Sequence, residues 1–423
     1  MTSIAEVASS RLVLAPFVAL RPDAEGPELA RRLSPPYDVV SPAQRRALLA
    51  ASPDNAVALI LPETDGTGDR YRAAADELQR QYAAGRWVRA DTPALYVYEM
   101  RTPDGPSTRG LIGAVELREP EENVILPHED TMAGPVADRL ALMEATNANL
   151  EPIYLVYDGG SGAAAQAVDA VGQRTPLADT VTPDGVGHRL WRLADPEQLS
   201  AIADDLAPRQ ALIADGHHRY ATYRELRRRR RAQLGPGPWD RGLTLLVDAR
   251  SYGPQVHAIH RVLNVLPYAD AVSRLAGRAS LVDYPDADTA LRAAADTPGF
   301  AAVLSDRQAF TVVRDLDPAL LAQLDAAEAL ARLDVVVLHR GLVERAWGLA
   351  DTTETVDYAH SVTDALQAAH ERHGTAVLLR PTPVRAVTDV AVHGGRMPRK
   401  STLFVPKPAS GLLVRRFVDE ADS

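Results

Sequence analysis

The amino-acid sequence predicts a mixed α+β fold, and three features support that prediction. Residues 94–100 and 111–117 have the pattern of strands on either side of a turn containing Pro and Gly, which is typical of a β-hairpin. Residues 138–148 carry apolar side chains at helical spacing, and a second, charged helix is expected over residues 217–231. Hairpins with interspersed helices favour an α+β architecture over a regular doubly wound parallel sheet.

The N-terminal part of the chain is expected to contain a buried strand and a capped helix. Residues 12–20 are apolar, but the stretch is short, contains Pro16 and lacks a basic segment before it, so it does not resemble an export signal. It is also too short for a membrane helix, which needs roughly 20 apolar residues. Ser41 followed by Pro42 has the pattern of an N-cap and first helical residue, ahead of a helix over residues 43–50.

The strongest predicted domain boundary is the Gly-Pro-Gly-Pro segment at residues 235–238. It separates a first domain, residues 1–235, from an α+β C-terminal domain, residues 236–423. The first domain should also contain strands over residues 152–157 and 211–214. For the second domain we expect strands at residues 243–248 and 376–379 and helices at residues 318–331, 335–348 and 361–373, the first capped by Asp317.

Composition excludes several classes of protein. The 423 residues contain no cysteine, which rules out disulfide frameworks, thiolate metal sites and a thiol nucleophile. The 56 acidic residues outnumber the 46 basic ones, and a net charge of −10 disfavours binding to nucleic acid and to anionic membranes. The five arginines at residues 227–231 are therefore interpreted as a solvated helix face. A cytoplasmic protein is expected.

Only two of the 46 basic residues are lysines, Lys400 and Lys407, and they lie seven residues apart. The arginine excess has a simple explanation in nucleotide composition. A lysine offers a compact point charge that arginine does not replace well at some phosphate sites. Either lysine is therefore a candidate functional residue.

The sharpest candidate site is the sequence Asp-Gly-His-His-Arg at residues 215–219, between a strand and a helix. Asp215 could hold a divalent cation, and Gly216 allows a sharp turn and close approach of a ligand. The N–H groups of the new helix favour an anion, and Arg219 can act as a phosphate clamp. In the alternative interpretation, Asp215 caps the helix and the histidines lie on its surface.

Two other segments have candidate chemistry. The loop at residues 127–131 holds His128 and Glu129, which could take a proton from an alcohol or hold a metal. From spacing alone, an ordinary polar loop capped by Asp130 or Thr131 is the favoured interpretation. The segment at residues 34–42 fixes Tyr37 and Asp38 between prolines, and it is functional only if it faces the same cleft.

Taken together, these segments resemble a known bacterial family, domain of unknown function 1015. The resemblance rests on five strings: SPPYDVVSP, ILPHEDT with ADRLALMEATNANLEPIYLVY, IADGHHRYATY, HAIHRVL and MPRKSTLFVPKPASG. They span residues 34–411. The DGHHRY turn is also similar to the phosphate loop of the ParB/sulfiredoxin superfamily, which includes the free serine kinases (SerK). His217 stands where sulfiredoxins carry their reactive cysteine, which excludes sulfinic acid repair.

The resemblance implies a ParB/sulfiredoxin-like mixed sheet that binds a nucleotide, ATP or ADP, with Mg²⁺. The nucleotide phosphates would lie at the turn of residues 216–219. The resemblance does not place the catalytic carboxylate by motif, so Glu129, tuned by His128, is the first candidate and Asp38 the second, with His218 as a further catalytic residue. The phosphate-binding residues expected are Gly216, His217, His218, Arg219, Arg139 and Lys400, with Asp215 as the metal ligand.

The activity implied is transfer of a phosphoryl group between a nucleotide and the hydroxyl of a small molecule, most simply free serine or phosphoserine. Two alternatives remain open at this point. A phosphatase would use the same phosphate site with water as acceptor, and a ParB-like regulatory protein would bind the nucleotide without transferring phosphate. The partners expected are a nucleotide and a small molecule, with no nucleic acid and no membrane; a homodimer is one expectation for the oligomeric state.

Overall fold

A computed structural model describes residues 11–420 except residues 65, 67, 104, 322–330, 332, 353, 393–394, 396 and 399. The chain forms two compact units. The first unit contains residues 1–127, 131–254 and 406–423, and the second contains residues 128–130 and 255–405. The predicted boundary after residue 235 does not coincide with the division between these units. The strand that follows residue 235 and the C-terminal segment both belong to the first unit. Both units mix helices and sheets, which confirms the α+β fold class.

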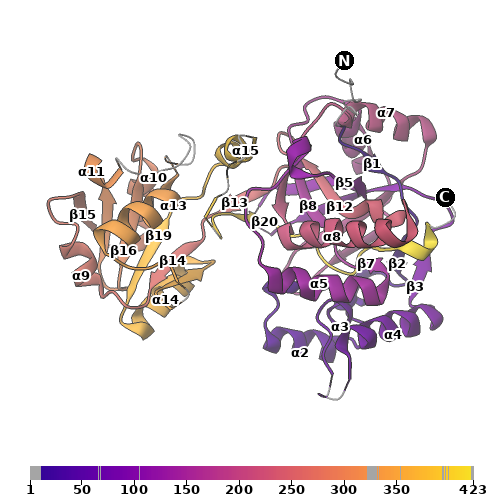
Figure 1. The fold of residues 1–423 in the computed structure, drawn as a ribbon, viewed down its shortest axis with the longest axis horizontal. Helices are drawn as coiled ribbons and strands as arrows, with labels where there is room; N and C mark the ends of the chain where they lie inside the picture. Colours follow the sequence, from indigo (N-terminus) through magenta and orange to yellow (C-terminus); the bar gives the residue numbers. More distant parts are fainter. Residues whose placement is uncertain are drawn as a thin grey trace. The chain divides into compact units, whose positions relative to one another are not determined.

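The core of the first unit is a mixed sheet with nine strands among the described residues (Figure 1). Its order is β6 (Ile125–Leu126), β11 (Ala211–Asp215), β8 (Ile153–Tyr157), β12 (Arg241–Asp248), β5 (Ser107–Glu116), β4 (Leu95–Arg101), β10 (Gly187–Leu193) and β9 (Ala178–Val181), with β1 (Leu14–Ala15) beside β5. β4 and β5 pair antiparallel, which confirms the predicted hairpin. β11 pairs antiparallel with β8 and parallel with β6, so it is held on both sides.

A smaller sheet in the first unit joins distant parts of the chain. Its order is β3 (Trp87–Arg89), β2 (Ala19–Pro22), β21 (Val414–Arg416) and β7 (Ala148–Asn149). β21 lies between β2 and β7, so the C-terminal segment is built into the first unit. The apolar stretch at residues 12–20 forms β1 and the start of β2 rather than one strand, because Pro16 interrupts it.

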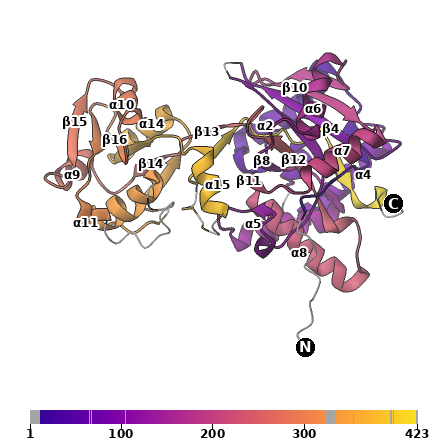
Figure 2. The ribbon, with the colours of Figure 1, turned by 90° about the horizontal axis from the view of Figure 1, so that it is seen from above.

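Helices cover the sheets of the first unit. They are α1 (Gly26–Arg32), α2 (Pro42–Ala51), α3 (Val57–Ile60), α4 (Arg70–Ala83), α5 (Ala133–Thr146), α6 (Ala163–Ala170), α7 (Pro196–Leu206) and α8 (His217–Leu234). Ser41 caps α2 by accepting a bond from the Gln44 N–H, as expected. α5 and α8 lie side by side (Figures 1 and 2), and Leu140 and Tyr220 place both in one apolar core with β8 and β11.

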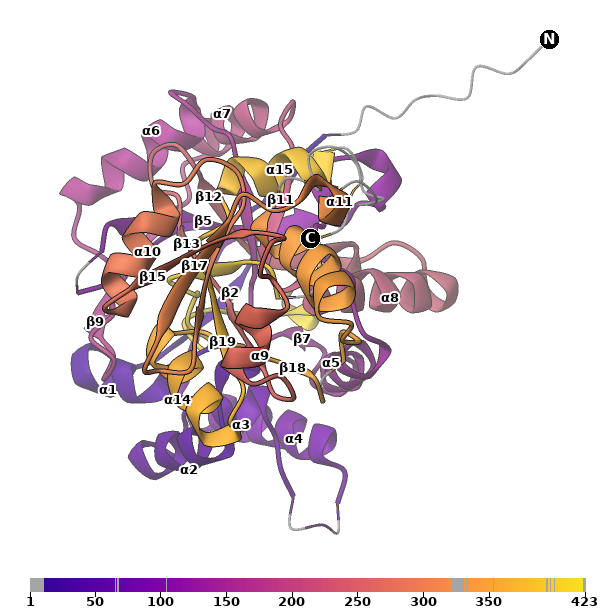
Figure 3. The same ribbon diagram turned by 90° about the vertical axis from the view of Figure 1, so that its left-hand side faces the viewer.

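The second unit has a six-stranded sheet in the order β15 (Ser280–Tyr284), β17 (Phe310–Arg314), β16 (Ala301–Ser305), β19 (Thr375–Leu379), β14 (His260–Leu263) and β18 (Val356–Ala359). A separate pair joins β13 (Gln255–His257) to β20 (Leu403–Val405). α10 (Ala287–Ala295) and α14 (Val362–Arg372) share one apolar core with this sheet (Figure 3). The other helical segments are α9 (Tyr268–Ser273), α11 (Pro318–Leu321), α13 (Asp334–Val336), a π-helix (Val337–Ala346) and α15 (Val384–Val392).

The helix expected over residues 318–331 begins as predicted, because the Asp317 carboxylate accepts a bond from the Ala319 N–H. Most of the rest of that helix lies outside the described residues. Within the described parts of the chain, no helix combines the length and apolarity that crossing a bilayer requires.

Candidate functional site

The centre of the candidate site is the turn between β11 and α8. Buried residues carry β11 up to Asp215, and the chain then turns at Gly216, whose φ of 92° lies in the left-handed region. Because the N-cap residue is a glycine, it has no side chain with which to cap the helix. A helix N-terminus presents backbone N–H groups and favours an anion. The strand, turn and helix therefore lie where the sequence predicted them.

Arg219 fixes this turn from inside the first unit. Its side chain is buried; its guanidinium donates to the Asp215 carboxylate and to the carbonyl oxygen of Pro152. Burial alone would lower the pKa of Arg219, but Asp215 and Glu151 outweigh burial and raise it. Arg219 is therefore a permanent cation beside the predicted phosphate position, and it also ties α8 to the residue before β8.

Lys407 reaches the same turn from the C-terminal segment. Its ammonium donates to Asp38 Oδ2 at 2.6 Å and lies 2.7 Å from Asp215 Oδ1. The Lys407 side chain is only 16% exposed. Burial would lower the pKa of this lysine, but the two carboxylates raise it above its usual value. Lys407 thus bridges Asp38 and Asp215 as a cation.

Asp38 lies on a single turn of 3-10 helix, Tyr37–Val39, which the preceding prolines lead into. Although burial opposes its charge, Lys407 and Arg219 lower the pKa of the Asp38 carboxyl. The Tyr37 N–H donates to Glu151 Oε1 at 3.1 Å, which anchors the turn to the segment before β8. Asp38 was expected to be functional only if its loop faced the same cleft as the Asp215 turn. Its contact with Lys407 places it in the Asp215 cluster.

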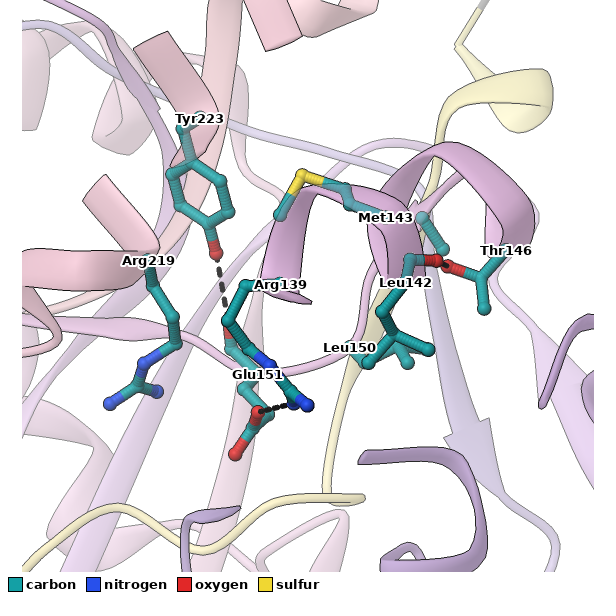
Figure 4. A pocket seen from close by; sticks show the side chains of 9 residues that line it. Arg139, Leu142, Met143, Thr146, Leu150, Glu151, Arg219 and Tyr223 are labelled. Carbon is teal, nitrogen blue, oxygen red and sulfur yellow. Dashed lines mark hydrogen bonds and ion pairs between the residues drawn. The ribbon is translucent and has the colours of Figure 1, made fainter. Parts of the chain in front are cut away.

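A pocket beside Arg219 is lined also by Arg139, Glu151 and Tyr223 (Figure 4). In Figure 4 the Arg139 guanidinium faces the Glu151 carboxylate, with Arg139 Nη1 3.9 Å from Glu151 Oε2. The Tyr223 hydroxyl donates to the Glu151 carbonyl oxygen at 2.8 Å. Ser410, from the C-terminal segment, donates to Glu151 Oε1 at 2.9 Å. Glu151 therefore connects the wall of this pocket to the Tyr37 turn and to the C-terminal segment.

Arg139 has many contacts of its own. It donates twice to Asp138 Oδ2, at 2.8 and 2.6 Å, and once to the Ile60 carbonyl oxygen at 2.5 Å. Its guanidinium carbon lies 4.3 Å from the centre of the Tyr37 ring. A second pocket, of about 580 Å³, includes Tyr37 and Arg139 in its wall. These contacts give Arg139 a structural role at both pockets, and its binding of phosphate stays a prediction.

The two histidines at the start of α8 differ in their surroundings. His217 is buried, whereas His218 is partly exposed. His218 Nε2 accepts a bond from the Met132 N–H at 3.1 Å, which leaves the ring proton on Nδ1 of a neutral imidazole. Burial lowers the pKa of His218, which agrees with the neutral form. His218 can therefore donate one hydrogen bond from Nδ1; its catalytic role stays a prediction.

Three predicted residues belong to the second unit. His128 is fully buried, with Nε2 3.0 Å from Thr402 Oγ1. The Lys400 ammonium lies 5.5 Å from the centre of the Tyr358 ring. Glu129 acts electrostatically on Arg261. Burial lowers the pKa of Arg261 to about 10, and the negative charge of Glu129 partly offsets that shift. The assignments of these three residues stay predictions that rest on the sequence motifs.

Two residues of the first-unit cluster had no assigned site role among the sequence predictions, although Lys407 was named with Lys400 as a candidate functional residue. Lys400 was assigned to phosphate, whereas the structure places Lys407 against Asp38 and Asp215. The scarcity of lysine was the available signal, but it does not distinguish the two positions. Glu151 was not singled out. An acidic residue two positions before a fully buried strand, with a proline between them, could have indicated it.

The described residues do not fit a Mg²⁺ ion held by Asp215. One Asp215 oxygen accepts from Arg219 and the other lies 2.7 Å from the Lys407 ammonium, so each already has a cationic partner. No group of three His, Asp or Glu side chains suited to a metal occurs among them. Mg²⁺ is commonly held by one or two carboxylates together with substrate phosphates, so an ion on Asp215 would first have to displace Lys407 or Arg219.

The conformation of Gly216 gives a first prediction. At φ 92° a Cβ would be strained, and it would lie 3.1–3.2 Å from the Arg219 guanidinium. Gly216→Ala should lower the free energy of unfolding by about 1–2 kcal/mol and weaken phosphate binding. The matched control is Gly134→Ala in α5, where a Cβ meets nothing within 4 Å. Equal nucleotide affinity in Gly216→Ala and the wild type would contradict the role of this turn.

Two buried tyrosines give a second prediction. The Tyr154 hydroxyl has no hydrogen-bond partner among the described residues, whereas that of Tyr223 donates to Glu151. An unpaired buried hydroxyl costs about 1–3 kcal/mol, so Tyr154→Phe should stabilise the protein by about 1 kcal/mol. Tyr223→Phe should destabilise it by a similar amount. Urea unfolding of the two variants checks the opposite signs; destabilisation by Tyr154→Phe would instead indicate a bound water or another partner.

Comparison with family models assigns the chain to a family. A family model described as a protein of unknown function (DUF1015) matches residues 14–336, which is more than half of the chain. The search of curated proteins found no match.

Solved structures show distant likenesses. A free serine kinase mutant in complex with ADP is 13% identical with a TM-score of 0.36, covering 72% of this chain and 90% of that one. A conserved hypothetical protein from Pyrococcus furiosus is 16% identical with a TM-score of 0.34, covering 70% and 93%. SbnI with C-terminal truncation from Staphylococcus aureus is 10% identical with a TM-score of 0.37, covering 74% and 90%.

Proposed function

Since the chain belongs to the DUF1015 family of proteins of unknown function, we propose from its candidate site that it is a phosphotransferase. It moves a phosphoryl group between a nucleotide, ATP or ADP, and the hydroxyl of a small molecule. Free serine or phosphoserine is the substrate pair, following the resemblance of the DGHHRY turn to that of free serine kinases. The observation that carries the proposal is the strand–Gly216–helix turn with the buried Arg219 and the partly buried Lys407 against it.

The chemistry of the turn supports a bound phosphate. Gly216 allows an oxygen ligand to approach the backbone closely, and the first turn of α8 favours negative charge. Arg219 and Lys407 add two cations, and nearby carboxylates raise the pKa of both. Phosphoryl transfer depends more on positioning and charge neutralisation than on covalent chemistry. A phosphate at this turn would be held by the N–H groups of α8 and by these two cations, which it would share with Asp38 and Asp215.

The proposed reaction is an in-line displacement at the γ-phosphorus of ATP. The serine hydroxyl oxygen attacks phosphorus, a new O–P bond forms, and the bond to ADP breaks with its electron pair leaving on ADP. Glu129, supported by His128, takes the proton of the hydroxyl, and Lys400 adds positive charge. These roles rest on the motif of residues 127–131 and on the lysine pattern. Asp38 is the second candidate for the base. In the reverse direction phosphoserine transfers its phosphoryl group to ADP.

An assay with phosphoserine separates this proposal from its rivals. Purified protein is incubated with phosphoserine, with and without ADP, and the products are separated by anion-exchange chromatography. Serine and ATP that form only when ADP is present support the transferase. Release of inorganic phosphate without ADP indicates a phosphatase. No turnover, together with tight and specific DNA binding at physiological salt, indicates a ParB-like regulatory protein and contradicts the proposal.

A further inference from the structure

Four charged side chains of the first unit are linked by ion pairs around the Asp215 turn: Asp38, Asp215, Arg219 and Lys407. Asp215 has Arg219 on one carboxylate oxygen and Lys407 within 2.7 Å of the other. Lys407 also donates to Asp38 at 2.6 Å. The Arg219, Asp215 and Lys407 side chains are 4%, 12% and 16% exposed, so water screens the contacts of Asp215 weakly, whereas Asp38, at 39%, is partly open to solvent. Two carboxylates and two cations give the group a net charge of zero.

The position of Lys407 is one that a bound metal ion would otherwise take. Two carboxylates from different parts of the first unit, Asp38 and Asp215, converge on one ammonium nitrogen at 2.6 and 2.7 Å. Paired carboxylate oxygens of this kind attract a divalent cation when no other cation is present. With Lys407 in place, a metal ion at Asp215 would have to displace it and would meet the charge of Arg219 as well.

The choice of residue at position 407 fits this role. The chain uses arginine at 44 of its 46 basic positions, yet the residue that joins the two carboxylates is a lysine. An ammonium is a compact charge with three donors on one atom, so it can serve two carboxylates that converge on one point. A planar guanidinium needs more room and presents its donors on separate nitrogens.

We propose that Lys407 is the resident cation of this site, which neutralises Asp38 and Asp215 and keeps divalent metal ions off both carboxylates. Any Mg²⁺ used by the protein then enters with the nucleotide phosphates rather than on Asp215. The inference deepens the proposed function, because it concerns the same phosphate site. Its test uses neither nucleotide nor serine, so its failure is distinct from failure of the proposed function.

The test is Mn²⁺ binding to the full-length protein without nucleotide, measured from the loss of the free-ion signal in electron paramagnetic resonance. Wild type and Asp215→Asn should bind Mn²⁺ with the same weak affinity. Lys407→Met removes a cation next to two carboxylates and should raise the affinity about tenfold or more. Asp215→Asn in the Lys407→Met background should reverse that gain. Lys407→Arg keeps the charge but carries its donors on separate nitrogens, so its Mn²⁺ affinity should lie between those of the wild type and Lys407→Met.

Lys400→Met is the matched control, because it removes the only other lysine of the chain and that residue lies in the second unit. It should leave Mn²⁺ affinity as in the wild type. Tight Mn²⁺ binding by the wild type that Asp215→Asn abolishes would overturn the proposal, and this comparison holds even if Lys407→Met does not fold. A folded Lys407→Met variant with wild-type Mn²⁺ affinity would also overturn it.

Discussion

Replacing Arg219 by alanine should lower the free energy of unfolding by about 3–5 kcal/mol, the range found when one partner of a buried ion pair is removed. Arg219 is 3% exposed, and it donates to the Asp215 carboxylate and the Pro152 carbonyl oxygen. Without it, Asp215 keeps its charge with only Lys407 to neutralise it, and the Pro152 carbonyl loses a buried donor. Urea unfolding followed by circular dichroism measures the change.

The matched control for Arg219→Ala lies on the same helix. Arg228 is paired with Glu225, but its side chain is 71% exposed. Because exposed ion pairs contribute little, Arg228→Ala should leave the free energy of unfolding unchanged. Equal stability of Arg219→Ala and Arg228→Ala would show that the Arg219–Asp215 pair does not hold the turn.

Because Arg219→Ala is expected to be strongly destabilising, a loss of activity in this variant would not demonstrate a role in catalysis. A variant that unfolds the first unit loses activity for a structural reason. Asp215→Asn is the better functional probe, because the amide keeps the size of the carboxylate, its oxygen can still accept the Arg219 hydrogen bond, and Lys407 keeps its bond to Asp38.

Glu129→Gln should lower the rate of phosphoryl transfer about 10²- to 10⁴-fold, the range that a general base contributes. The glutamine amide cannot accept the proton of the attacking hydroxyl, although it has the same shape. The measurement is kcat for phosphoserine formation from ATP and serine. The expected loss is in kcat rather than in the affinity for ADP, since the proposed role of Glu129 is in proton transfer.

Asp130→Asn is the control for Glu129→Gln, because it removes a carboxylate from the neighbouring residue, which is exposed. It should retain most of the wild-type kcat. If Glu129→Gln retained wild-type kcat, the base would have to be another group, and Asp38→Asn would be the next variant to measure.

Local sequence patterns predicted the elements that make the Asp215 turn. The apolar residues 211–214 and the charged residues that follow Gly216 differ so strongly in pattern that the change from strand to helix is visible in the sequence. The hairpin of β4 and β5 was visible for the same reason, since its turn residues lie between two apolar strands. Both depend on residues close together in the chain.

Long-range pairing could not be predicted in this way. β21 pairs with β2, so that Val414 lies opposite Leu20, and this pairing returns the C-terminal segment to the first unit. That return carries Lys407 and Ser410 to the Asp215 cluster and to Glu151. Periodicity indicates which face of a strand is buried, but not which distant strand lies beside it. The choice between Lys400 and Lys407 therefore required the structure.

The most direct test of the central claim is phosphorus NMR of the reaction approached from both sides. One sample starts from ATP, serine and Mg²⁺, and the other from ADP, phosphoserine and Mg²⁺, each with the same amount of protein. A phosphotransferase should bring both samples to the same mixture of ATP, ADP and phosphoserine, and Asp215→Asn should slow both approaches. Accumulation of inorganic phosphate alone, or no change in either sample, would contradict phosphoryl transfer between nucleotide and serine.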